Sequence, residues 1–449
     1  MLSALRSAPD TPAVESNGRV VTRGELLGMA RRIAGGFAKM GLGRGVGVGL
    51  RLPLTPEAYA AHLAAHVLGA TVAAFRPAWG PAQLESARAH VDVVVDDLTD
   101  LLAAEPLDVT PRAHPDDVAR LLFTSGTTGR PKACAHKYRA IGLAYEKDRW
   151  PAPLARMMRD FSRYLVIAHI SGPPMFTYLG RTLVAGGTAV LIGDGMGVPE
   201  AIARTGCTAV VMRPPLLAAT LDSTVDLGGL RAVVLGGSPA SPALLEAATA
   251  RLGPIVWQVY GQSEAGAISM LTPDDIAAGH AASVGRPVSD VELDIREGEI
   301  WVRSPHMMSG YLDETEDVLR DGWLNTRDRG HVDADGRLHL TGRSRDVIMV
   351  NAEVCYAGAI ERVLALHPDV AQAFAVGVPD RRTGEAIHAF VVPAGDRRPP
   401  PDELTALTRL HLSVNSVPST FTVIHDIPLT ATGKPDKPAL FRAASPEEI

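Results

Sequence analysis

The chain has 449 residues, 46% hydrophobic and 21% charged, a globular balance in a length that predicts two or more domains. Its formal net charge of −6, with no block of like charge, excludes a nucleic-acid partner from our expectations. The most apolar stretch, 58–75, contains two histidines and many alanines, so we expect a packed helix and a strand there, and no membrane partner. Three cysteines without metal-ligand spacing favour the reducing cytoplasm as the location.

The first strong pattern along the chain is a helix that begins at a capping box formed by Thr22 and Glu25. Apolar residues recur at helical spacing as far as Phe37, and Gly41 ends the run. The glycine-rich string 41–50 then leads into strand-like alternation. A dinucleotide-binding fingerprint requires its glycines between a strand and a helix, so this string does not predict one.

Short apolar runs alternate with helical patterns as far as about residue 283. Such runs between amphipathic helices are typical of parallel strands that are covered on both faces. The pattern therefore predicts an α/β fold. The predicted strands are 91–95, 121–124, 164–168, 188–192, 208–212, 231–235 and 255–259.

Antiparallel structure is predicted after residue 283. The segments 291–296 and 299–303 alternate around a Glu-Gly turn and predict a hairpin, and 337–340 predicts a further strand. A small α/β unit is expected from about residue 345. Its predicted elements are helices near 358–366 and 402–412, strands near 371–378 and 387–392, and a proline-rich surface loop at 397–403.

A loop rich in glycine and hydroxyl groups, FTSGTTGRPKA (123–133), directly follows an apolar strand. Its backbone N–H groups, its hydroxyls and Lys132 can face phosphate oxygens; a polar surface turn is the alternative. A Walker-type loop is not expected. Pro131 and Ala133 stand where that motif requires a glycine and a hydroxyl residue.

This loop resembles the phosphate-binding signature of the adenylate-forming superfamily, which comprises acyl-CoA synthetases, peptide-synthetase adenylation domains and beetle luciferases. The usual form is Ser/Thr-Ser-Gly-Thr-Thr-Gly-x-Pro-Lys-Gly, and the chain departs from it at Ala133. Three further segments resemble family motifs and follow in the family's order: YGQSEAG (260–266), WLNTRDRGHVDADGRLHLTGRSRD (323–346) and PLTATGKPDK (428–437). The resemblance implies an AMP-forming acid-thiol ligase of the acyl-CoA synthetase type, which uses ATP and Mg²⁺.

The resemblance also implies roles for single residues. Glu264 would offer a carboxylate to Mg²⁺, and Asp328 and Arg343 would hold the ribose or the phosphates. Lys434 would bridge the acyl carboxylate and the α-phosphate. The alternatives are a buried loop carboxylate without a ligand for Glu264, a surface ion pair for Arg343 and a solvent-exposed lysine for Lys434. Arg327 stands where the family usually has a glycine.

The implied catalytic residues are Lys434, Glu264 and Thr124, and the implied ATP-binding residues are Thr124, Ser125, Gly126, Thr127, Thr128, Gly129, Lys132, Gly237, Tyr260, Gly261, Ser263, Asp328, Arg343 and Lys434.

The acyl pocket is expected around His169, because VIAHISGPPMF (166–176) resembles the family's His-x-x-Gly element. A structural histidine is the alternative. No acidic residue between Phe161 and Gly180 could pair with a substrate ammonium, so an α-amino acid is not expected. Small apolar walls suit an acid with a neutral aryl or medium aliphatic tail. The implied pocket residues are His169, Ser171, Gly172, Gly236, Gly237, Val259, Ala265 and Ala267.

Family members have a large N-terminal domain of two parallel-sheet subdomains plus a small distorted β-barrel, and a small mobile C-terminal lid. The resemblance therefore implies an N-terminal core at 1–344 and a lid at 345–449, with a hinge at Arg345 and Asp346. Rotation of such a lid would exchange the adenylation site for an acyl-transfer site.

The acyl acceptor implied by the family is a thiol, either of CoA or of a phosphopantetheinyl carrier protein. The segment 342–361 departs from the family's usual lid sequence at Ala352, Ala357 and Ala359. Two alternatives therefore stay open. One is an adenylate-forming enzyme that uses an amine or an inorganic anion as the nucleophile, and the other is a nucleotide-binding relative without turnover.

Overall fold

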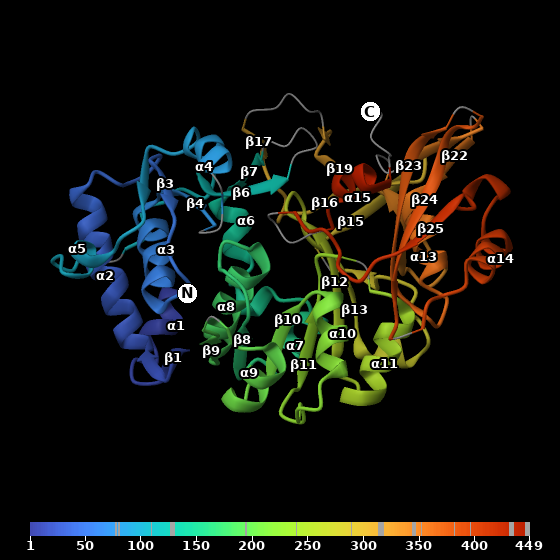
Figure 1. Ribbon diagram of the computed structural model, residues 1–449. Helices are drawn as coiled ribbons and strands as arrows, with labels where there is room; N and C mark the ends of the chain where they lie inside the picture. The colour runs from blue at the N-terminus through green and yellow to red at the C-terminus, as the bar shows by residue number, and fades with distance from the viewer. Residues whose placement is uncertain are drawn as a thin grey trace.

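The computed structural model is an α/β protein built on four sheets (Figure 1). Three sheets form the large N-terminal part, and the fourth forms a smaller C-terminal part. The residues described are 1–76, 79, 81–108, 110–125, 131–193, 195–238, 240–288, 290–312, 318–343, 347–351, 353–380, 382–395, 397–430 and 435–444.

One sheet of the N-terminal part has six strands, in the order β17-β7-β6-β4-β3-β5. Helix α2 (Arg23–Lys39) begins at the predicted capping box, in which the Thr22 side chain accepts from the Glu25 N–H and the Glu25 carboxylate accepts from the Thr22 N–H. The prediction for this helix is confirmed. The strands are β3 (Gly47–Leu50), β4 (Thr71–Ala74), β5 (Val93–Val95) and β6 (Val118–Ser125), which run parallel, and the antiparallel β7 (Pro131–Lys137) and β17 (Gly310–Tyr311).

A nine-stranded sheet with the order β14-β13-β12-β11-β10-β8-β9-β1-β2 forms the centre of the molecule. Successive residues of its strands face two different cores: Tyr164 belongs to one and Leu165 to the other. The sheet is therefore buried on both faces, as predicted. Its strands are β1 (Pro12–Ser16), β2 (Arg19–Thr22), β8 (Arg163–Val166), β9 (Thr188–Leu191), β10 (Ala209–Met212), β11 (Ala232–Leu235), β12 (Val256–Gln262), β13 (Gly266–Leu271) and β14 (Arg286–Pro287).

Helices cover these two sheets and separate them. The larger ones are α3 (Pro56–Leu68), α4 (Pro81–Arg88), α8 (Pro173–Ala185), α9 (Val198–Thr205), α10 (Pro214–Asp222) and α11 (Pro242–Leu252). The shorter ones are α1 (Leu2–Arg6), α5 (Thr99–Leu102), α6 (Tyr138–Leu143), α7 (Ala152–Met158), α12 (Pro273–Ala277) and the 3₁₀ turn Lys147–Arg149. None of the helices in the described part of the chain combines the length and the hydropathy needed to cross a membrane.

An antiparallel sheet follows, as the sequence predicted. The hairpin turns at Glu297 and Gly298, whose φ angles of 51° and 78° are those of a type I′ turn. Tyr311 of β17 returns from this region to pair with Cys134 of β7, so the antiparallel sheet is tied to the six-stranded one. Its strands are β15 (Glu292–Arg296), β16 (Glu299–Arg303), β18 (Leu319–Arg320), β19 (Trp323–Val332) and β20 (Leu338–Arg343).

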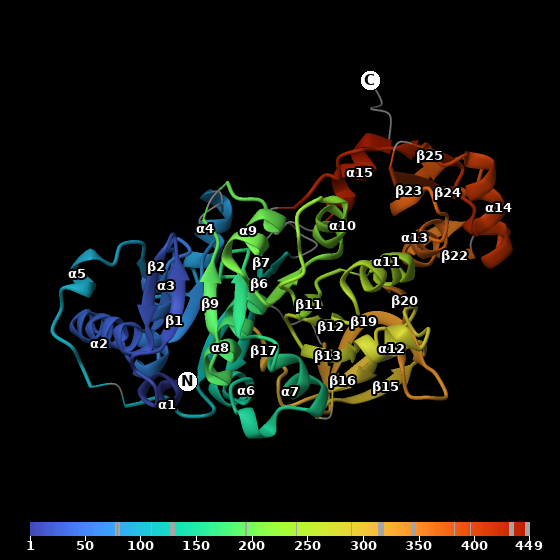
Figure 2. The same cartoon turned by 90° about the horizontal axis from the view of Figure 1, so that it is seen from below.

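The C-terminal part has its own sheet and its own core, and it lies to one side of the N-terminal part in Figure 2. The predicted loop 397–403 is wrong at its end, because α14 already begins at Pro401. Proline is compatible with the first helical turn, where its missing N–H has no helical partner to lose. The elements are β21 (Val347–Val350), β22 (Glu353–Tyr356), α13 (Ala357–Leu364), β23 (Val370–Asp380), β24 (Gly384–Pro393), α14 (Pro401–His411), the 3₁₀ turn Val414–Ser416, β25 (Thr420–Val423) and α15 (Lys437–Ala444).

Two buried histidines make the N-terminal part sensitive to acid. Burial lowers the pKa of His136 to about 4 and that of His66 to about 3. The unfolded chain, with histidine pKa values near 6.5, binds more protons than the native chain below that pH. As the pH is lowered from about 6.5 to 4, we therefore expect the free energy of unfolding to fall by about 1 kcal/mol per histidine for each pH unit.

Urea denaturation of the wild type and of His66→Leu at pH 7 and pH 5 tests this expectation. The variant should lose less stability on acidification than the wild type. Equal losses would contradict the assignment of His66 as an acid-sensitive group.

Candidate functional site

The predicted site residues gather at the carboxyl ends of strands in the nine-stranded sheet. His169 follows β8, and Gly236 and Gly237 directly follow β11. Val259 lies on β12, the neighbouring strand. This edge is where open α/β sheets bind their ligands.

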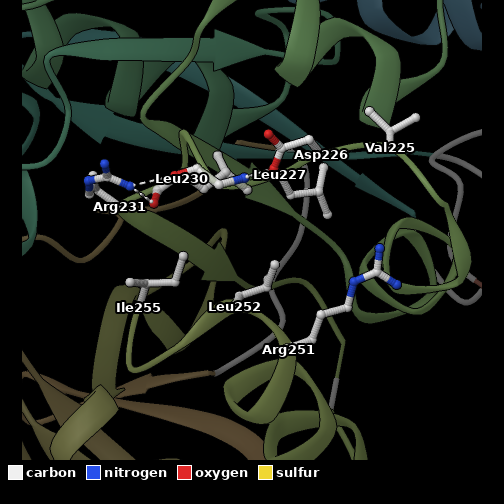
Figure 3. Close-up of a pocket in the computed structure, with 9 residues that line it drawn as sticks. Val225, Asp226, Leu227, Leu230, Arg231, Arg251, Leu252 and Ile255 are labelled. Atoms are coloured by element: carbon white, nitrogen blue, oxygen red, sulfur yellow. Dashed lines mark hydrogen bonds between the residues drawn. The ribbon is translucent and has the colours of Figure 1, made fainter.

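A surface pocket of about 360 Å³ lies at the opposite edge, where β11 and β12 begin (Figure 3). Its charged side chains are bonded to backbone groups: Arg231 donates to the carbonyl oxygen of Gly228 at 2.8 Å, and Asp226 accepts from the Gly228 N–H at 2.8 Å. Arg251 donates to the carbonyl oxygen of Ser223. The polar groups do not converge on the cavity, so this pocket does not compete with the predicted site.

Asp328 is held by two side chains of the second motif. The Asp328 Oδ2 atom accepts hydrogen bonds from the Tyr260 hydroxyl and from Gln262 Nε2, both at 2.6 Å. Gln262 Nε2 also lies 2.9 Å from the Thr326 carbonyl oxygen. The buried carboxylate is therefore fixed in orientation by neutral donors. Gln262 was missed by the sequence analysis because it occupies the variable position of the motif.

Arg327 has a left-handed backbone, with φ of +58°. Its N–H donates to Asn325 Oδ1 at 2.7 Å, which supports this conformation. Left-handed backbone costs L residues about 1–2 kcal/mol, and glycine adopts it freely. The position therefore has the backbone geometry for which a glycine would be the usual choice, and the arginine keeps it.

Glu264 and Lys132 are brought together through Tyr311. The Tyr311 hydroxyl donates to Glu264 Oε1 at 2.8 Å, and the Lys132 Nζ lies 5.3 Å from the centroid of the Tyr311 ring. A half-buried carboxylate beside a lysine suits a magnesium–phosphate pair, because Mg²⁺ takes few protein carboxylates and several phosphate or water oxygens. The residues present therefore fit a Mg²⁺-bound nucleotide.

Several predicted residues lie outside the described part of the chain: Gly126, Thr127, Thr128, Gly129, Arg345, Asp346 and Lys434. The side chains of Thr124, Ser125 and Arg343 are also not described. Their backbones are placed. Thr124 pairs with Lys132 across β6 and β7, and Arg343 pairs with Asp328 across β19 and β20. The two residues expected to hold the ribose thus face each other on neighbouring strands.

The turn between β12 and β13 carries Glu264 and is held on both sides. His136 Nε2 lies 2.8 Å from the carbonyl oxygen of Ser263. Gly261 pairs with Ala267, and a Cβ atom at Gly261 would lie 2.2 Å from the carbonyl oxygen of Gly266. The motif requires its glycine because the two strands approach each other too closely for a side chain.

Gly261→Ala should therefore push the two strands apart. We expect it to lower the free energy of unfolding by about 1–3 kcal/mol, the usual cost of overpacking, and to displace Glu264. Gly142→Ala is the matched control, because nothing lies within 4 Å of a Cβ at that helical position. Chemical denaturation that shows equal stability for both variants would contradict this account of the turn.

His169 is held by the protein at both ring nitrogens. Its Nε2 lies 2.7 Å from the Leu52 carbonyl oxygen and donates to it, while Nδ1 accepts from the Ser171 N–H at 3.1 Å. Burial lowers the pKa of His169, and the bond to Leu52 opposes that shift. The ring is therefore a neutral brace between the end of β3 and the start of α8, where Gly172 is the N-cap. These bonds are those of a structural histidine, although its ring is only half-buried.

The glycines after β11 leave space beside β12. A Cβ at Gly236 would lie 3.4 Å from the Val259 carbonyl oxygen, and Gly237 has φ of +83°. The side chain of Arg213, after β10, lies 3.7 Å from the position of a Gly237 Cβ. An arginine that was not among the predicted pocket residues thus joins the predicted apolar walls.

The two predicted alanines of the pocket differ in exposure. Ala267 is half-buried, whereas the neighbouring pocket candidate Ser171 is buried. The Ala265 side chain is 1% exposed and packs in one cluster with Cys134 and Ile268. Ala265 therefore packs in the core below the turn between β12 and β13.

The chain resembles known proteins in both sequence and fold. The sequence model of the AMP-binding enzyme family matches residues 3–96 and 88–312, and that of the AMP-binding enzyme C-terminal domain matches residues 359–434. The chain is 35% identical over 347 residues to a 3-[(3aS,4S,7aS)-7a-methyl-1,5-dioxo-octahydro-1H-inden-4-yl]propanoyl:CoA ligase of Mycobacterium tuberculosis. That alignment covers 73% of this chain and 66% of the ligase, so the chain spans just under two thirds of its length.

Two further proteins are similar over more of their length. A 2-succinylbenzoate–CoA ligase of Bacillus licheniformis is 32% identical over 360 residues, which cover 74% of this chain and 71% of that ligase. The structure of an amide bond synthetase from Marinactinospora thermotolerans superposes with a TM-score of 0.86 and 34% identity, and covers 99% of this chain and 100% of that one. The four motifs, the sheet arrangement and these matches agree: the chain belongs to the AMP-binding enzyme family of the adenylate-forming superfamily and is similar to its acyl-CoA ligases.

Proposed function

We propose that the protein activates a carboxylic acid with ATP as the acyl-adenylate and then transfers the acyl group to a thiol. The observation that carries the proposal is the meeting of Glu264 with Lys132 of the phosphate loop through Tyr311. Asp328 supports it, because Tyr260 and Gln262 hold in one orientation a carboxylate that could accept hydrogen bonds from ribose hydroxyls.

Adenylation joins a carboxylate oxygen of the acid to the α-phosphorus of ATP and breaks the bond between that phosphorus and the pyrophosphate oxygen. Mg²⁺ held by Glu264 would neutralise charge on the phosphates. Lys132 and Lys434 would add positive charge, Lys434 between the acyl carboxylate and the α-phosphate. Asp328 and Arg343 would hold the ribose.

The proposed substrate is an aryl or medium aliphatic acid and not an α-amino acid. Two of the related ligases are named for the acids that they use, a bicyclic propanoic acid and 2-succinylbenzoate. Neither carries an α-ammonium group. The absence of acidic residues from 161–180 supports the same limit, because a buried ammonium needs a carboxylate partner.

The proposed acceptor is the thiol of CoA or of a carrier protein, in the cytoplasm. The thiolate would attack the carbonyl carbon of the adenylate and release AMP. A second candidate is an amine acceptor, which would give an amide. The similarity to an amide bond synthetase over the whole chain favours it, as do Ala352, Ala357 and Ala359 in the lid segment.

Pyrophosphate release with Mg²⁺ and ATP tests both candidates. A panel of aryl, aliphatic and amino acids would be assayed alone, with CoA and with simple amines. Release that requires an acid and rises with CoA, with formation of a thioester, is the expected result. Amide formation with an amine and no thioester with CoA would select the second candidate. Absence of acid-dependent release across the panel, with ATP still bound, would contradict both.

A further inference from the structure

A buried arginine without a counter-charge lies on β6, the strand that leads to the phosphate loop. Arg120 is 4% exposed, and its Nε and Nη2 atoms are buried without a hydrogen-bond partner. Its guanidinium lies 4.1 Å from the centroid of the Phe176 ring on α8. Within the described ranges no carboxylate pairs with it. Burial lowers the pKa of the Arg120 guanidinium, and the neighbouring hydroxyls of Tyr145 and Tyr59 oppose that shift.

The groups around Arg120 are also short of partners. His62 Nδ1 and His66 Nε2, both on α3, are buried and make no hydrogen bond. Burial, followed by the positive charge of Arg120, lowers the pKa of both rings and keeps them neutral. The Arg120 cation and the two neutral histidine rings, each with a nitrogen that makes no hydrogen bond, are thus buried close together. An unpaired charge in such an environment is costly unless a counter-charge neutralises it.

Arg23 shows how the same protein satisfies a structural arginine. It is 3% exposed, and its Nη1 donates to the carbonyl oxygens of Ala4 and Leu183 at 3.1 and 2.9 Å. Its Nη2 donates to the Gly187 carbonyl oxygen at 2.9 Å, so only Nε is left over. Packing and backbone carbonyls hold Arg23 in place. Arg120 has the burial of a structural arginine without those bonds.

The cluster of Arg120, His62 and His66 lies next to the predicted acyl pocket. Phe176 is on α8, the helix that begins directly after the loop of His169 and Gly172. The centroids of the His62 and Phe176 rings are 5.1 Å apart, and a charge on His169 is close enough to act on His62. Phe176, on the helix that begins at this side of the predicted pocket, is therefore the contact that links the pocket to Arg120.

We propose that Arg120, with His62 and His66, forms an anion-binding floor of the acyl pocket. The acid substrate would carry a second, distal anionic group that pairs with the guanidinium. This inference rests on the proposed acid activation, and it replaces the neutral tail expected from the sequence with a tail that ends in a second anionic group. A free inorganic anion has the same chemistry, and the experiment separates the two sources.

The test compares acids that differ only at the distal end: terephthalate with 4-methylbenzoate, and adipate with hexanoate. In wild-type protein we expect kcat/KM for pyrophosphate release to favour the diacid of a pair by roughly 100-fold, the scale of a buried charge-assisted pair. In Arg120→Met the ratio of diacid to monoacid should fall to about one or below. In the matched variant Arg23→Met the ratio should stay as in the wild type. Arg120→Lys, which keeps the charge, should retain part of the preference and serves if Arg120→Met does not fold.

Melting temperatures without ATP give a second measurement that does not need turnover. The diacid should raise the melting temperature of the wild type and not that of Arg120→Met. Equal use of diacid and monoacid by the wild type would overturn the inference even if pyrophosphate is released. A chloride- or phosphate-dependent rise in melting temperature that needs Arg120, without a diacid preference, would assign the site to a free anion and overturn the substrate claim. Failure of every acid in turnover, with an Arg120-dependent shift by the diacid, would reject the proposed function and keep the anion site.

Discussion

Replacing Lys434 by alanine is expected to reduce acid-dependent pyrophosphate release by at least about 10²–10³-fold, the usual effect of removing one preorganised group that stabilises transition-state charge. ATP binding should be retained, because the loop 123–133, Tyr260 and Asp328 remain. The reduction should appear in kcat, since the lysine is expected to act on charge that develops during the reaction.

Lys437→Ala is the matched control for Lys434→Ala. Lys437 is three residues further along, and its Nζ lies 2.8 Å from Glu361, in an ion pair within the C-terminal part. Its loss should leave pyrophosphate release within a few-fold of wild type. Unchanged release in Lys434→Ala, with ATP binding also unchanged, would reject Lys434 as the catalytic lysine.

Glu264→Gln is expected to lower pyrophosphate release by roughly 10²-fold at ordinary Mg²⁺ concentration, because a neutral amide replaces the carboxylate that would hold the metal. The substitution keeps the shape of the side chain, and the Tyr311 hydroxyl can still donate to the amide oxygen. The fold should therefore be retained. The Mg²⁺ concentration that gives half-maximal activity should rise.

Tyr311→Phe separates the effect of the hydrogen bond between Tyr311 and Glu264 from the effect of the Glu264 carboxylate itself. It removes the hydroxyl that lies 2.8 Å from Glu264 Oε1 and keeps the carboxylate. Its effect should be smaller than that of Glu264→Gln. The same Mg²⁺ dependence in wild type and Glu264→Gln would rule out Glu264 as a metal ligand.

Much of the fold could be predicted because its signals are local. The capping box at Thr22 and Glu25 begins α2, and the Glu297-Gly298 turn adopts the left-handed angles that the hairpin requires. The apolar runs became strands of two largely parallel sheets. Predicted element boundaries were wrong where a proline is compatible with both a loop and the first turn of a helix, as at Pro401.

The candidate site was predictable only where its residues belong to motifs. Glu264, Asp328 and Lys132 could be named from the sequence, and the structure brings each of them to a partner. Tyr311 and Gln262 could not be named, because their roles depend on pairings between segments far apart in the chain. The proposed domain division at 344 and 345 and the hinge at Arg345 and Asp346 remain predictions.

Arg120 shows the same limit most clearly. In the sequence it is one polar residue within an apolar strand. Its importance follows from what surrounds it in space: α3 from one part of the chain and α8 from another, with unpartnered nitrogens on the first and an aromatic ring on the second. No sequence pattern signals a missing counter-charge.

The central claim, that the chain forms an acyl-adenylate, is tested most directly by oxygen transfer. The acid with the highest pyrophosphate release would be supplied with ¹⁸O in its carboxylate, together with ATP, Mg²⁺ and the acceptor. Attack on the α-phosphorus, followed by loss of AMP from the acyl carbon, must carry one carboxylate oxygen into AMP. Mass spectrometry should therefore find one ¹⁸O in AMP and none in pyrophosphate. Unlabelled AMP, or label in inorganic phosphate with ADP as the product, would contradict the account.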